Sequence, residues 1–337
     1  MHPADALDRI VCLLDRVLAE GQKVKAFARA RDVVLATHDD ELVRLHRLGK
    51  LTDLAGVGPT TGKVIAEALD GGTPGYLAEL EETTVLPVGE GAGLRAALRG
   101  DCHTHSTWSD GGAPIEKMAR TAIALGHEYM VLTDHSPRLT VARGLTAERL
   151  RAQLDEVDRL NEALAPFRIL TGIEVDILPD GELDQREDLL ARLDVVVGSV
   201  HSKLRMERAE MTRRMVAAVA SPHVDILGHC TGRKLVGRGR PPSVFDPEIV
   251  FAACAQFDTA LEINCRPERQ DPPDDLVELA LDWGLRFAVD TDAHAPGQME
   301  WQVYGCDKAA RHGIDPDRIV NTMAADDLVA WAASHPA

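Results

Sequence analysis

From residue 100 to the C-terminus, short runs of β-branched and aliphatic residues alternate with longer amphipathic stretches. This alternation predicts parallel strands joined by crossover helices, because parallel neighbours cannot be joined by tight turns. Seven runs qualify, one fewer than an eight-stranded barrel requires. We therefore expect an α/β fold built as an incomplete (βα) barrel, with an open doubly wound sheet as the alternative. The predicted strands are residues 100–103, 129–133, 169–175, 195–200, 224–227, 260–263 and 287–289.

A histidine or a carboxylate residue stands at the end of every predicted strand except the sixth. His103 and His105 are two residues apart, which places both imidazoles on one face of a strand, and Asp292 and His294 repeat this spacing. The C-terminal ends of parallel strands meet at one edge, so side chains far apart in the sequence are expected to converge there. The candidate metal ligands are His103, His105, Asp110, His135, Glu174, His201, His229, Asp292 and His294.

The prediction of a metal site depends on the whole set, because a single histidine after a strand is most often an ordinary hydrogen-bonding residue. Six of the 13 histidines fall at these positions, and three carboxylates accompany them. Buried imidazoles and carboxylates are costly without partners, so such a set indicates ion binding rather than coincidence. Nitrogen and oxygen donors without sulfur suit Zn, Mn or Fe and do not select one of them.

Six short motifs carry a resemblance to the PHP (polymerase and histidinol phosphatase) family. They read Asp-Cys-His-Thr-His-Ser-Thr-Trp-Ser-Asp-Gly, Leu-Thr-Asp-His-Ser, Gly-Ile-Glu-Val-Asp, Ser-Val-His-Ser, Leu-Gly-His and Asp-Thr-Asp-Ala-His. The resemblance covers residues 100 to about 335. It implies a distorted (βα)7 barrel that binds up to three metal ions, and suitable residues occupy all nine of the usual ligand positions.

The resemblance also implies how the ligands are shared. His103, His105, Glu174 and Asp292 would hold one ion, and Glu174 would bridge to a second ion held by His201 and His229. Asp110, His135 and His294 would hold the third. Closely spaced metal ions lower the pKa of a water between them and clamp phosphate oxygens during in-line displacement. Glu174 and His201 are therefore the expected catalytic side chains, and no side-chain nucleophile is required.

Three arginines near the predicted strand ends are candidates for gripping a phosphate group. Arg233 follows His229, and Arg266 and Arg269 follow the sixth predicted strand. A guanidinium group binds phosphate oxygens in bidentate fashion, which suits this task. The alternative, that each is an ordinary solvated loop arginine, stays open from the sequence.

Residues 1–86 differ from the rest of the chain, because their apolar residues recur at helical spacing. Residues 51–67 resemble a helix-hairpin-helix motif, in which Gly56 and Gly58 would let backbone amides approach a DNA phosphate, with Lys63 nearby. We expect a small all-helical domain at 1–86, a glycine-rich linker at 87–99, and the phosphoesterase domain at 100–337.

Residues 5–85 also resemble the N-terminal domain of family X DNA polymerases, whose bacterial members carry a C-terminal PHP domain. This chain resembles such a polymerase without its nucleotidyltransferase domain, since the predicted linker leaves no room for a polymerase site. Val64 stands where the resemblance places a Schiff-base lysine, with Lys63 beside it, so lyase activity is not expected. A helical domain used for docking or dimerisation is the alternative to DNA binding.

Charge and cysteine content restrict the remaining possibilities. The net charge of −17, with 10 basic against 14 acidic residues in the first 86, opposes nonspecific attraction to nucleic acid over the whole surface. The six cysteines are scattered without a CxxC pair, which indicates reduced thiols. Neither an apolar membrane span nor a secretory leader is recognisable, so a cytoplasmic location is expected.

These observations together predict a metal-dependent phosphoesterase acting on the 3′ ends of DNA, by exonuclease or phosphatase action. The first alternative is a phosphomonoesterase for small molecules, of the histidinol-phosphate type. The second is a DNA-binding or scaffold module without catalysis, which nine intact ligand positions argue against.

Overall fold

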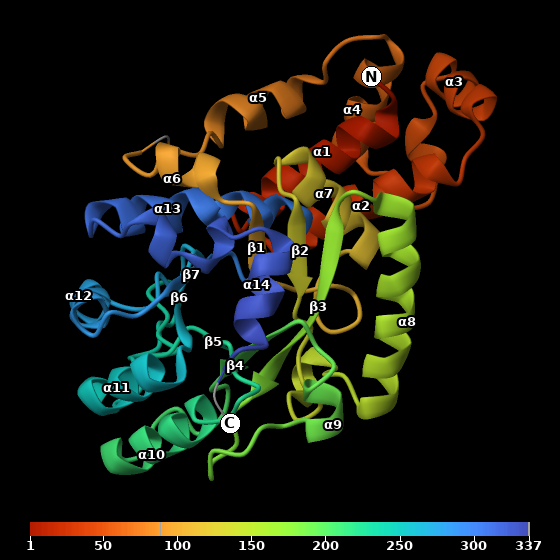
Figure 1. The fold of residues 1–337 in the computed structure, drawn as a ribbon. Coiled ribbons are helices and arrows are strands. Elements are labelled where there is room, and N and C mark those ends of the chain that lie inside the picture. Colours follow the sequence, from red (N-terminus) through yellow and green to blue (C-terminus); the bar gives the residue numbers. More distant parts are fainter. Residues whose placement is uncertain (88, 336–337) are drawn as a thin grey trace. The chain divides into compact units, whose positions relative to one another are not determined.

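The computed structural model describes residues 1–87 and 89–335, and these divide into two compact units, Met1–Pro87 and Val88–Ala337 (Figure 1). Residue 88, in the expected linker, and residues 336–337, at the end of the expected second domain, lie outside the described residues. No helix in the described part of the chain is both long enough and apolar enough to cross a membrane.

The segment expected to be a linker differs from that expectation. Ala92–Ala97 forms helix α6, and Leu94 and Leu98 are buried in the core of the second unit. The glycines that suggested flexibility allow close packing instead. A Cβ atom on Gly91 would lie 2.3 Å from the backbone carbon of Cys306, and the Gly91 amide donates to the Asp307 carboxylate at 2.8 Å. This segment is therefore part of the second unit.

The first unit is all helical, with an apolar core of its own. Its amphipathic helices place Leu7, Ile10 and Leu14 of the first helix against Phe27 and the other buried residues of that core. Its elements are α1 (Pro3–Arg16), α2 (Gly21–Leu35), α3 (Asp39–Arg47), the 3₁₀ turn η1 (Leu51–Asp53), α4 (Pro59–Leu69) and α5 (Gly75–Thr83).

The second unit is built on seven parallel strands whose spatial order follows their order in the sequence. A parallel bridge between Thr104 and Ala293, next to the first and last strands, brings the two edges of the sheet together. A doubly wound sheet would reverse its strand order, so the sheet is the incomplete (βα)7 barrel that the sequence predicted. The strands are β1 (Gly100–Thr104), β2 (Tyr129–Leu132), β3 (Arg168–Asp176), β4 (Val195–Ser199), β5 (Ile226–Leu227), β6 (Ala260–Asn264) and β7 (Phe287–Asp290).

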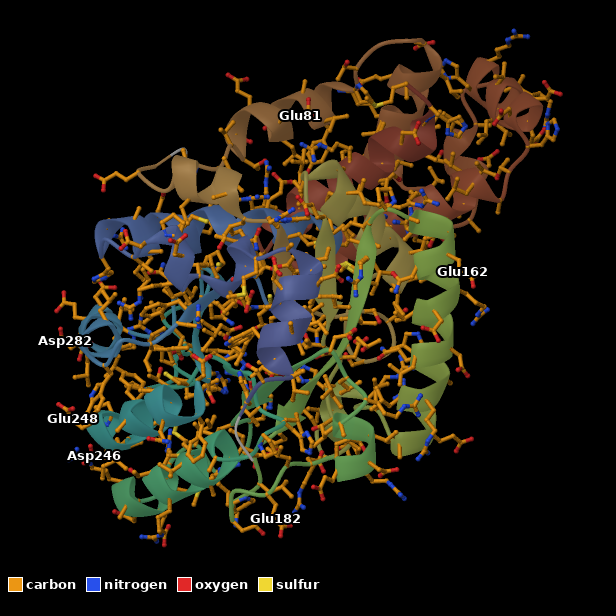
Figure 2. All side chains as sticks on the ribbon, in the orientation of Figure 1. Glu81, Glu162, Glu182, Asp246, Glu248 and Asp282 are labelled. Atoms are coloured by element: carbon orange, nitrogen blue, oxygen red, sulfur yellow. The ribbon has the colours of Figure 1, made fainter. Side chains whose placement is uncertain are left out.

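A helix follows each strand and lies outside the barrel (Figure 1). Exposed acidic side chains of this outer layer, such as Glu162, Glu248 and Asp282, project outward from it (Figure 2). These helices are α7 (Ile115–Ala124), α8 (Ala147–Leu164), α9 (Glu187–Leu190), α10 (Arg208–Val219), α11 (Pro247–Phe257), α12 (Asp274–Asp282) and α13 (Gln302–Arg311). A further helix, α14 (Ala325–Ala332), follows α13 and packs onto the buried residues of the strands.

The interior of the barrel is packed with side chains, as close packing requires. Val131, Val197 and Ile226 belong to one buried cluster with Leu328 and Trp331 of α14. The short turn η5 (Val320–Thr322) precedes α14 and contacts β1 and β7. Apolar side chains thus fill the barrel from within, and polar side chains gather where the strands end.

Candidate metal centre

All nine predicted ligands lie at the C-terminal ends of the strands or in the loops that follow them. His103 and Glu174 lie within β1 and β3, whereas the others come one to six residues after their strands. Asp292 adopts a left-handed backbone conformation with φ 51°, which a short polar residue tolerates better than a bulky one. The chain therefore turns sharply between Asp292 and His294, and both side chains face the same centre.

Glu174 lies at the middle of the cluster. Its carboxylate lies 2.9 Å from His229 Nε2 and 3.1 Å from His201 Nε2 through Oε1. Its other oxygen, Oε2, is 2.8 Å from His135 Nδ1, 3.4 Å from His103 Nε2 and 3.6 Å from His105 Nε2. One buried carboxylate thus faces five imidazoles that come from four different strand ends.

Two further carboxylates complete the cluster. Asp292 Oδ1 lies 3.4 Å from both His105 Nε2 and His294 Nδ1. Asp110 Oδ1 lies 3.4 Å from His294 Nε2 and 3.5 Å from His135 Nε2. Three groups have donor atoms close enough to share an ion: His105, Asp110, His135 and His294; His103, His105 and Glu174; and His135, Glu174 and His201.

Several buried polar atoms of the cluster form no hydrogen bond to any described residue. Within the described residues, these atoms have no hydrogen-bond partner: His103 Nε2, His105 Nδ1 and Nε2, His135 Nδ1, His201 Nδ1, His229 Nδ1 and Glu174 Oε2. Leaving a buried polar atom unpaired costs about 1–3 kcal/mol, and native proteins rarely leave several together. The arrangement is the one expected of donors that share a cation.

Electrostatic interactions keep the carboxylates of the cluster ionised. Burial opposes ionisation of Glu174, but His201, His135 and His103 lower its pKa well below the usual value. Burial likewise opposes ionisation of Asp292, whose pKa is held low by Arg266 and His103. Ionised carboxylates are the form in which these residues ligate a cation.

Glu262 in β6 is a candidate functional residue that the sequence patterns did not single out. Its Oε1 lies 2.6 Å from His103 Nδ1, and its Oε2 accepts the backbone N–H of His229 at 2.5 Å. The signal was present, because Glu262 and Asn264 interrupt the apolar run of β6 and share one face of that strand. A carboxylate in a fully buried strand requires partners, and here those partners are two predicted ligands.

The three candidate arginines have different surroundings. Arg266 donates to the backbone oxygen of Asp292 at 2.7 Å and to Glu268 at 2.9 Å, and it lies 3.0 Å from His294 Nδ1. Arg233 donates to the backbone oxygens of Arg269 and Gln270. These contacts hold Arg266 and Arg233 in the loops that surround the cluster.

Arg269 has buried N–H groups that form no hydrogen bond within the described part of the chain. Its Nε lies 3.4 Å from Asp292 Oδ2, but Nε and Nη1 are buried and form no hydrogen bond with any described residue. A buried guanidinium with free N–H groups beside this cluster can donate charge-assisted hydrogen bonds to an anionic oxygen.

The predicted DNA-contacting residues lie in the first unit, between η1 and α4. Gly56 has φ +101°, a conformation that favours glycine, and a Cβ atom there would lie 3.1 Å from the Arg29 side chain. Gly58 precedes α4 with open space around its Cα, and its amide donates to Thr61 Oγ1 at 2.9 Å. Lys63 is exposed and lies 3.6 Å from Glu67, whereas Val64 beside it is buried in the core.

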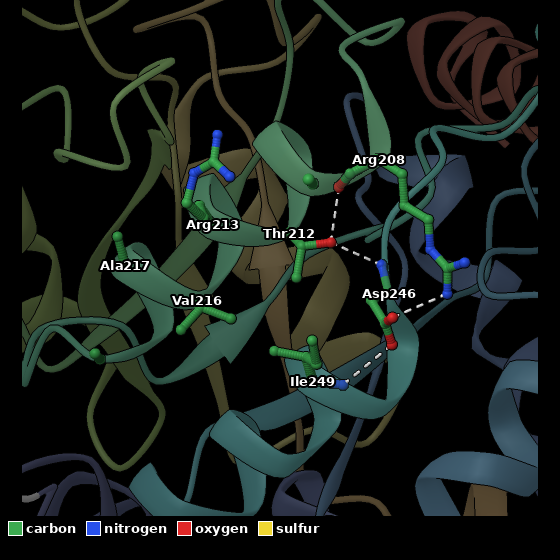
Figure 3. Close-up of a pocket in the computed structure, with 9 residues that line it drawn as sticks. Arg208, Thr212, Arg213, Val216, Ala217, Asp246 and Ile249 are labelled. Carbon is green, nitrogen blue, oxygen red and sulfur yellow. Dashed lines mark hydrogen bonds and ion pairs between the residues drawn. The ribbon is translucent and has the colours of Figure 1, made fainter.

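A second hollow, between α10 and α11, has no comparable chemistry (Figure 3). Its lining is mainly apolar, from residues such as Val216 and Ile249. The Asp246 carboxylate is paired with Arg208 at 3.0 Å, and the Asp246 amide donates to Thr212 Oγ1 at 2.8 Å. Polar groups satisfied in this way leave the metal cluster as the chemically active candidate.

Comparisons with known proteins identify related sequences and structures. The family model described as the PHP domain matches residues 101–233. The chain is 39% identical over 234 residues to a DNA polymerase/3′-5′ exonuclease PolX from Bacillus subtilis, and the match covers 69% of this chain and 41% of that protein. It is 30% identical over 237 residues to a probable phosphatase from Thermoanaerobacter sp., covering 66% of this chain and 89% of that protein.

Among solved structures, the chain is similar to a histidinol phosphate phosphatase from Lactococcus lactis, solved with zinc, L-histidinol and phosphate. The TM-score is 0.45 at 18% identity, and the match covers 63% of this chain and 93% of that one. The assignment of the barrel itself follows from the strand order and the bridge between Thr104 and Ala293 described above.

Proposed function

This chain belongs to the PHP family of metal-dependent phosphoesterases, and on that premise we propose that its cluster hydrolyses phosphate esters at the 3′ ends of DNA. The observation that carries the proposal is the group of buried, unpaired imidazole and carboxylate atoms around Glu174. These atoms form a donor set for cations, placed where barrel enzymes build their active sites.

The donor set fits two or three divalent ions held by His103, His105, Asp110, His135, Glu174, His201, His229, Asp292 and His294. Its nitrogen and oxygen atoms suit Zn, Mn or Fe. When bound, such ions supply Lewis acidity, which lowers the pKa of water and neutralises charge on a phosphoryl group. In this proposal Glu174, which faces five histidines, is the residue that the ions share.

The exposure of the ligands indicates the side from which a phosphate enters. His103, His105, Glu174 and His229 are buried, whereas the side chains of Asp110 and His294 are 39% and 22% exposed. We propose that the ester approaches past Asp110 and His294. In this arrangement the free donors of Arg269 orient a phosphate oxygen, and Arg266 keeps Asp292 and His294 in position.

DNA is favoured as the substrate by two independent features of the chain. The similarity to the Bacillus protein named polymerase/3′-5′ exonuclease extends over 234 residues. The first unit adds the Gly56–Gly58 turn in front of α4, where helix N-terminal amides suit a backbone phosphate. We propose that the first unit contacts DNA while the cluster of the second unit acts on the 3′ end.

A small phosphomonoester is the second candidate substrate. It is favoured by the similarity to the probable phosphatase, because that match covers 89% of the relative and requires no DNA-binding unit. A small ester would use the same metal ligands and the same role for Arg269. The two candidate substrates differ only in what is attached to the phosphate.

A substrate panel on the metal-reconstituted protein separates the two candidates. The panel contains p-nitrophenyl phosphate, histidinol phosphate, an oligonucleotide with a 3′-phosphate and one with a recessed 3′-hydroxyl. We expect kcat/KM on one of the DNA ends to exceed that on either small ester, and a chelator to abolish all activity. Turnover of the small esters alone would contradict the DNA proposal, and no turnover of any substrate would contradict hydrolysis itself.

A further inference from the structure

The loop after β5 forms a two-stranded turn next to the metal cluster, and we call residues 231–240 the basic hairpin. The backbones of Lys234 and Arg240 pair across it. The Lys234 amide donates to the Arg240 oxygen at 2.9 Å, and the Arg240 amide donates to the Lys234 oxygen at 2.8 Å. Gly237 and Gly239 have φ values of +72° and +62°, which allows the tight turn at the tip. The hairpin is therefore a defined element that projects from the end of a barrel strand.

The base of the basic hairpin is attached to the loops that carry the site. The Leu235 amide donates to the backbone oxygen of Glu268 at 2.7 Å, and Arg233 Nε donates to that of Arg269 at 3.1 Å. On its other side, the amide of Gly232 donates to the backbone oxygen of His229 at 2.8 Å. The hairpin is thus held beside a predicted ligand and beside the arginine with free donors.

The charge of the basic hairpin is opposite to that of the protein as a whole. Residues 228–245 contain four basic and no acidic residues, in a chain of net charge −17. Lys234 and Arg238 are exposed, and no ion pair is found for them among the described side chains. Lys203 and Arg205, in the loop after β4, are also exposed, and no ion pair is found for them among the described side chains. Leu204, which lies between them in the sequence, lies against Gly232.

The cations around the hairpin repel one another. Although Lys234 is exposed as a residue, partial burial of its ammonium group, followed by the charges of Arg269, Arg240 and Arg266, lowers its pKa. Burial and Arg269 likewise lower the pKa of Arg240. The acidic side chains that give the protein its net charge include those that project from the outer helices, such as Glu162 and Asp282 (Figure 2). Concentrated, mutually repelling cations are stabilised by a polyanion.

The tip of the basic hairpin exposes two aliphatic side chains. Leu235 is 53% exposed and Val236 is 63% exposed. Cations beside apolar contacts match a nucleic-acid strand, which presents phosphates along its backbone and apolar faces on its bases. A small ester has no further phosphates for Lys234 and Arg238 to bind.

We propose that the basic hairpin binds the nucleic-acid strand that leads into the metal cluster. In this arrangement Lys234 and Arg238 contact backbone phosphates upstream of the 3′ end, and Leu235 and Val236 contact bases or sugars. The inference rests on the proposed function, because it assumes that the cluster acts on a phosphate of the same strand.

Lys234→Ala/Arg238→Ala tests the proposal in the full-length protein, with Arg213→Ala as the control. Arg213 is an exposed arginine on α10, beside the second hollow (Figure 3). Fluorescence anisotropy of a labelled single-stranded oligonucleotide measures binding to the metal-free protein. The slope of log K against log salt should become shallower by about 1.4, since each lost contact to a single strand removes about 0.7.

We expect the double variant to bind the oligonucleotide at least tenfold more weakly than the wild type, and Arg213→Ala to bind it as the wild type does. Hydrolysis of p-nitrophenyl phosphate should be the same in all three proteins. Leu235→Ser should weaken binding without changing the salt slope. Unchanged affinity and slope in the double variant would overturn the proposal, as would inorganic polyphosphate that displaces the oligonucleotide equally well at matched charge.

The two proposals fail in different ways. If the wild type processes 3′ ends and the double variant does so with unchanged kcat/KM, the hairpin proposal is wrong and the proposed function stands. If the wild type binds the oligonucleotide through the hairpin but leaves every 3′ end intact, the proposed function is wrong and the hairpin proposal stands.

Discussion

Glu262 Oε1 lies 2.6 Å from His103 Nδ1, and neither side chain is exposed to solvent. A carboxylate on the far nitrogen of a metal-binding histidine orients the ring and increases its basicity, and losing it typically costs about 10–100-fold in metal affinity. Glu262 thus contacts His103, and through the His229 amide it also contacts a second predicted ligand, so we expect it to position both.

The first prediction is that Glu262→Gln lowers metal affinity about tenfold or more, because the amide keeps the shape of the side chain but loses its charge. Chelator competition and elemental analysis measure the change. Glu182→Gln serves as the matched control, because Glu182 is an exposed residue at the surface (Figure 2). Equal metal affinity in the Glu262 variant and the control would refute the positioning role.

Glu174→Gln should have a larger effect, because Glu174 faces five imidazoles where Glu262 faces one. We expect metal occupancy to fall and turnover to drop by several orders of magnitude, while the apolar core of the barrel keeps the protein folded. Metal content, circular dichroism and steady-state kinetics test this together. Wild-type kcat in this variant would rule out a shared ligand at position 174.

Arg269→Ala should affect phosphate binding, whereas Arg266→Ala should affect metal retention. Removing the free donors of Arg269 should raise KM and the inhibition constant of inorganic phosphate, by roughly tenfold or more for a charge-assisted hydrogen bond of about 1.5–3 kcal/mol. Arg266→Ala should instead weaken metal retention, because it removes the contacts to Asp292 and His294. Phosphate inhibition and metal content, measured on both variants, separate the roles, and identical profiles would contradict the distinction.

Deleting residues 1–87 should weaken action on DNA but leave hydrolysis of p-nitrophenyl phosphate nearly intact, because each unit has its own apolar core. Comparing the full-length and shortened proteins at several salt concentrations measures the DNA contribution of the first unit. If both proteins process DNA ends equally well, the helical unit has another role, such as docking or dimerisation.

His127 should make the second unit sensitive to acid. Burial and the nearby Arg95 charge lower its pKa to about 3. The unfolded chain takes up a proton below about pH 6.5, whereas the folded protein does so only near pH 3, so stability falls as the pH drops through this window. At pH 5 the free energy of unfolding is lower by about 2 kcal/mol than at neutral pH because of this group. Chemical denaturation of His127→Asn from pH 7 to 4.5 should show a weaker pH dependence than the wild type, and identical slopes would contradict the assignment.

The amino-acid sequence by itself determined the succession of parallel strands and nine residues of the cluster. Both depend on local patterns: apolar runs of strand length, and spacings such as those of His103 with His105 and Asp292 with His294. Since parallel strands end at a common edge, these local signals are sufficient to predict convergence. The all-helical character of the first unit followed from periodicity in the same way.

Only the tertiary structure decided which groups meet across the chain. Glu262 is 159 residues from His103, and no local pattern connects them. Arg266 and Arg269 are equivalent candidates in the sequence, but Arg266 is hydrogen-bonded to Asp292 and lies beside His294, whereas Nε and Nη1 of Arg269 form no hydrogen bond with any described residue. The glycines before α6 suggested a linker, but Gly89 and Gly91 are instead explained by the close approach of Asp307 and Cys306. Hydrogen bonds and packing between distant segments depend on the folded path of the chain, and residue identity and spacing do not encode that path locally.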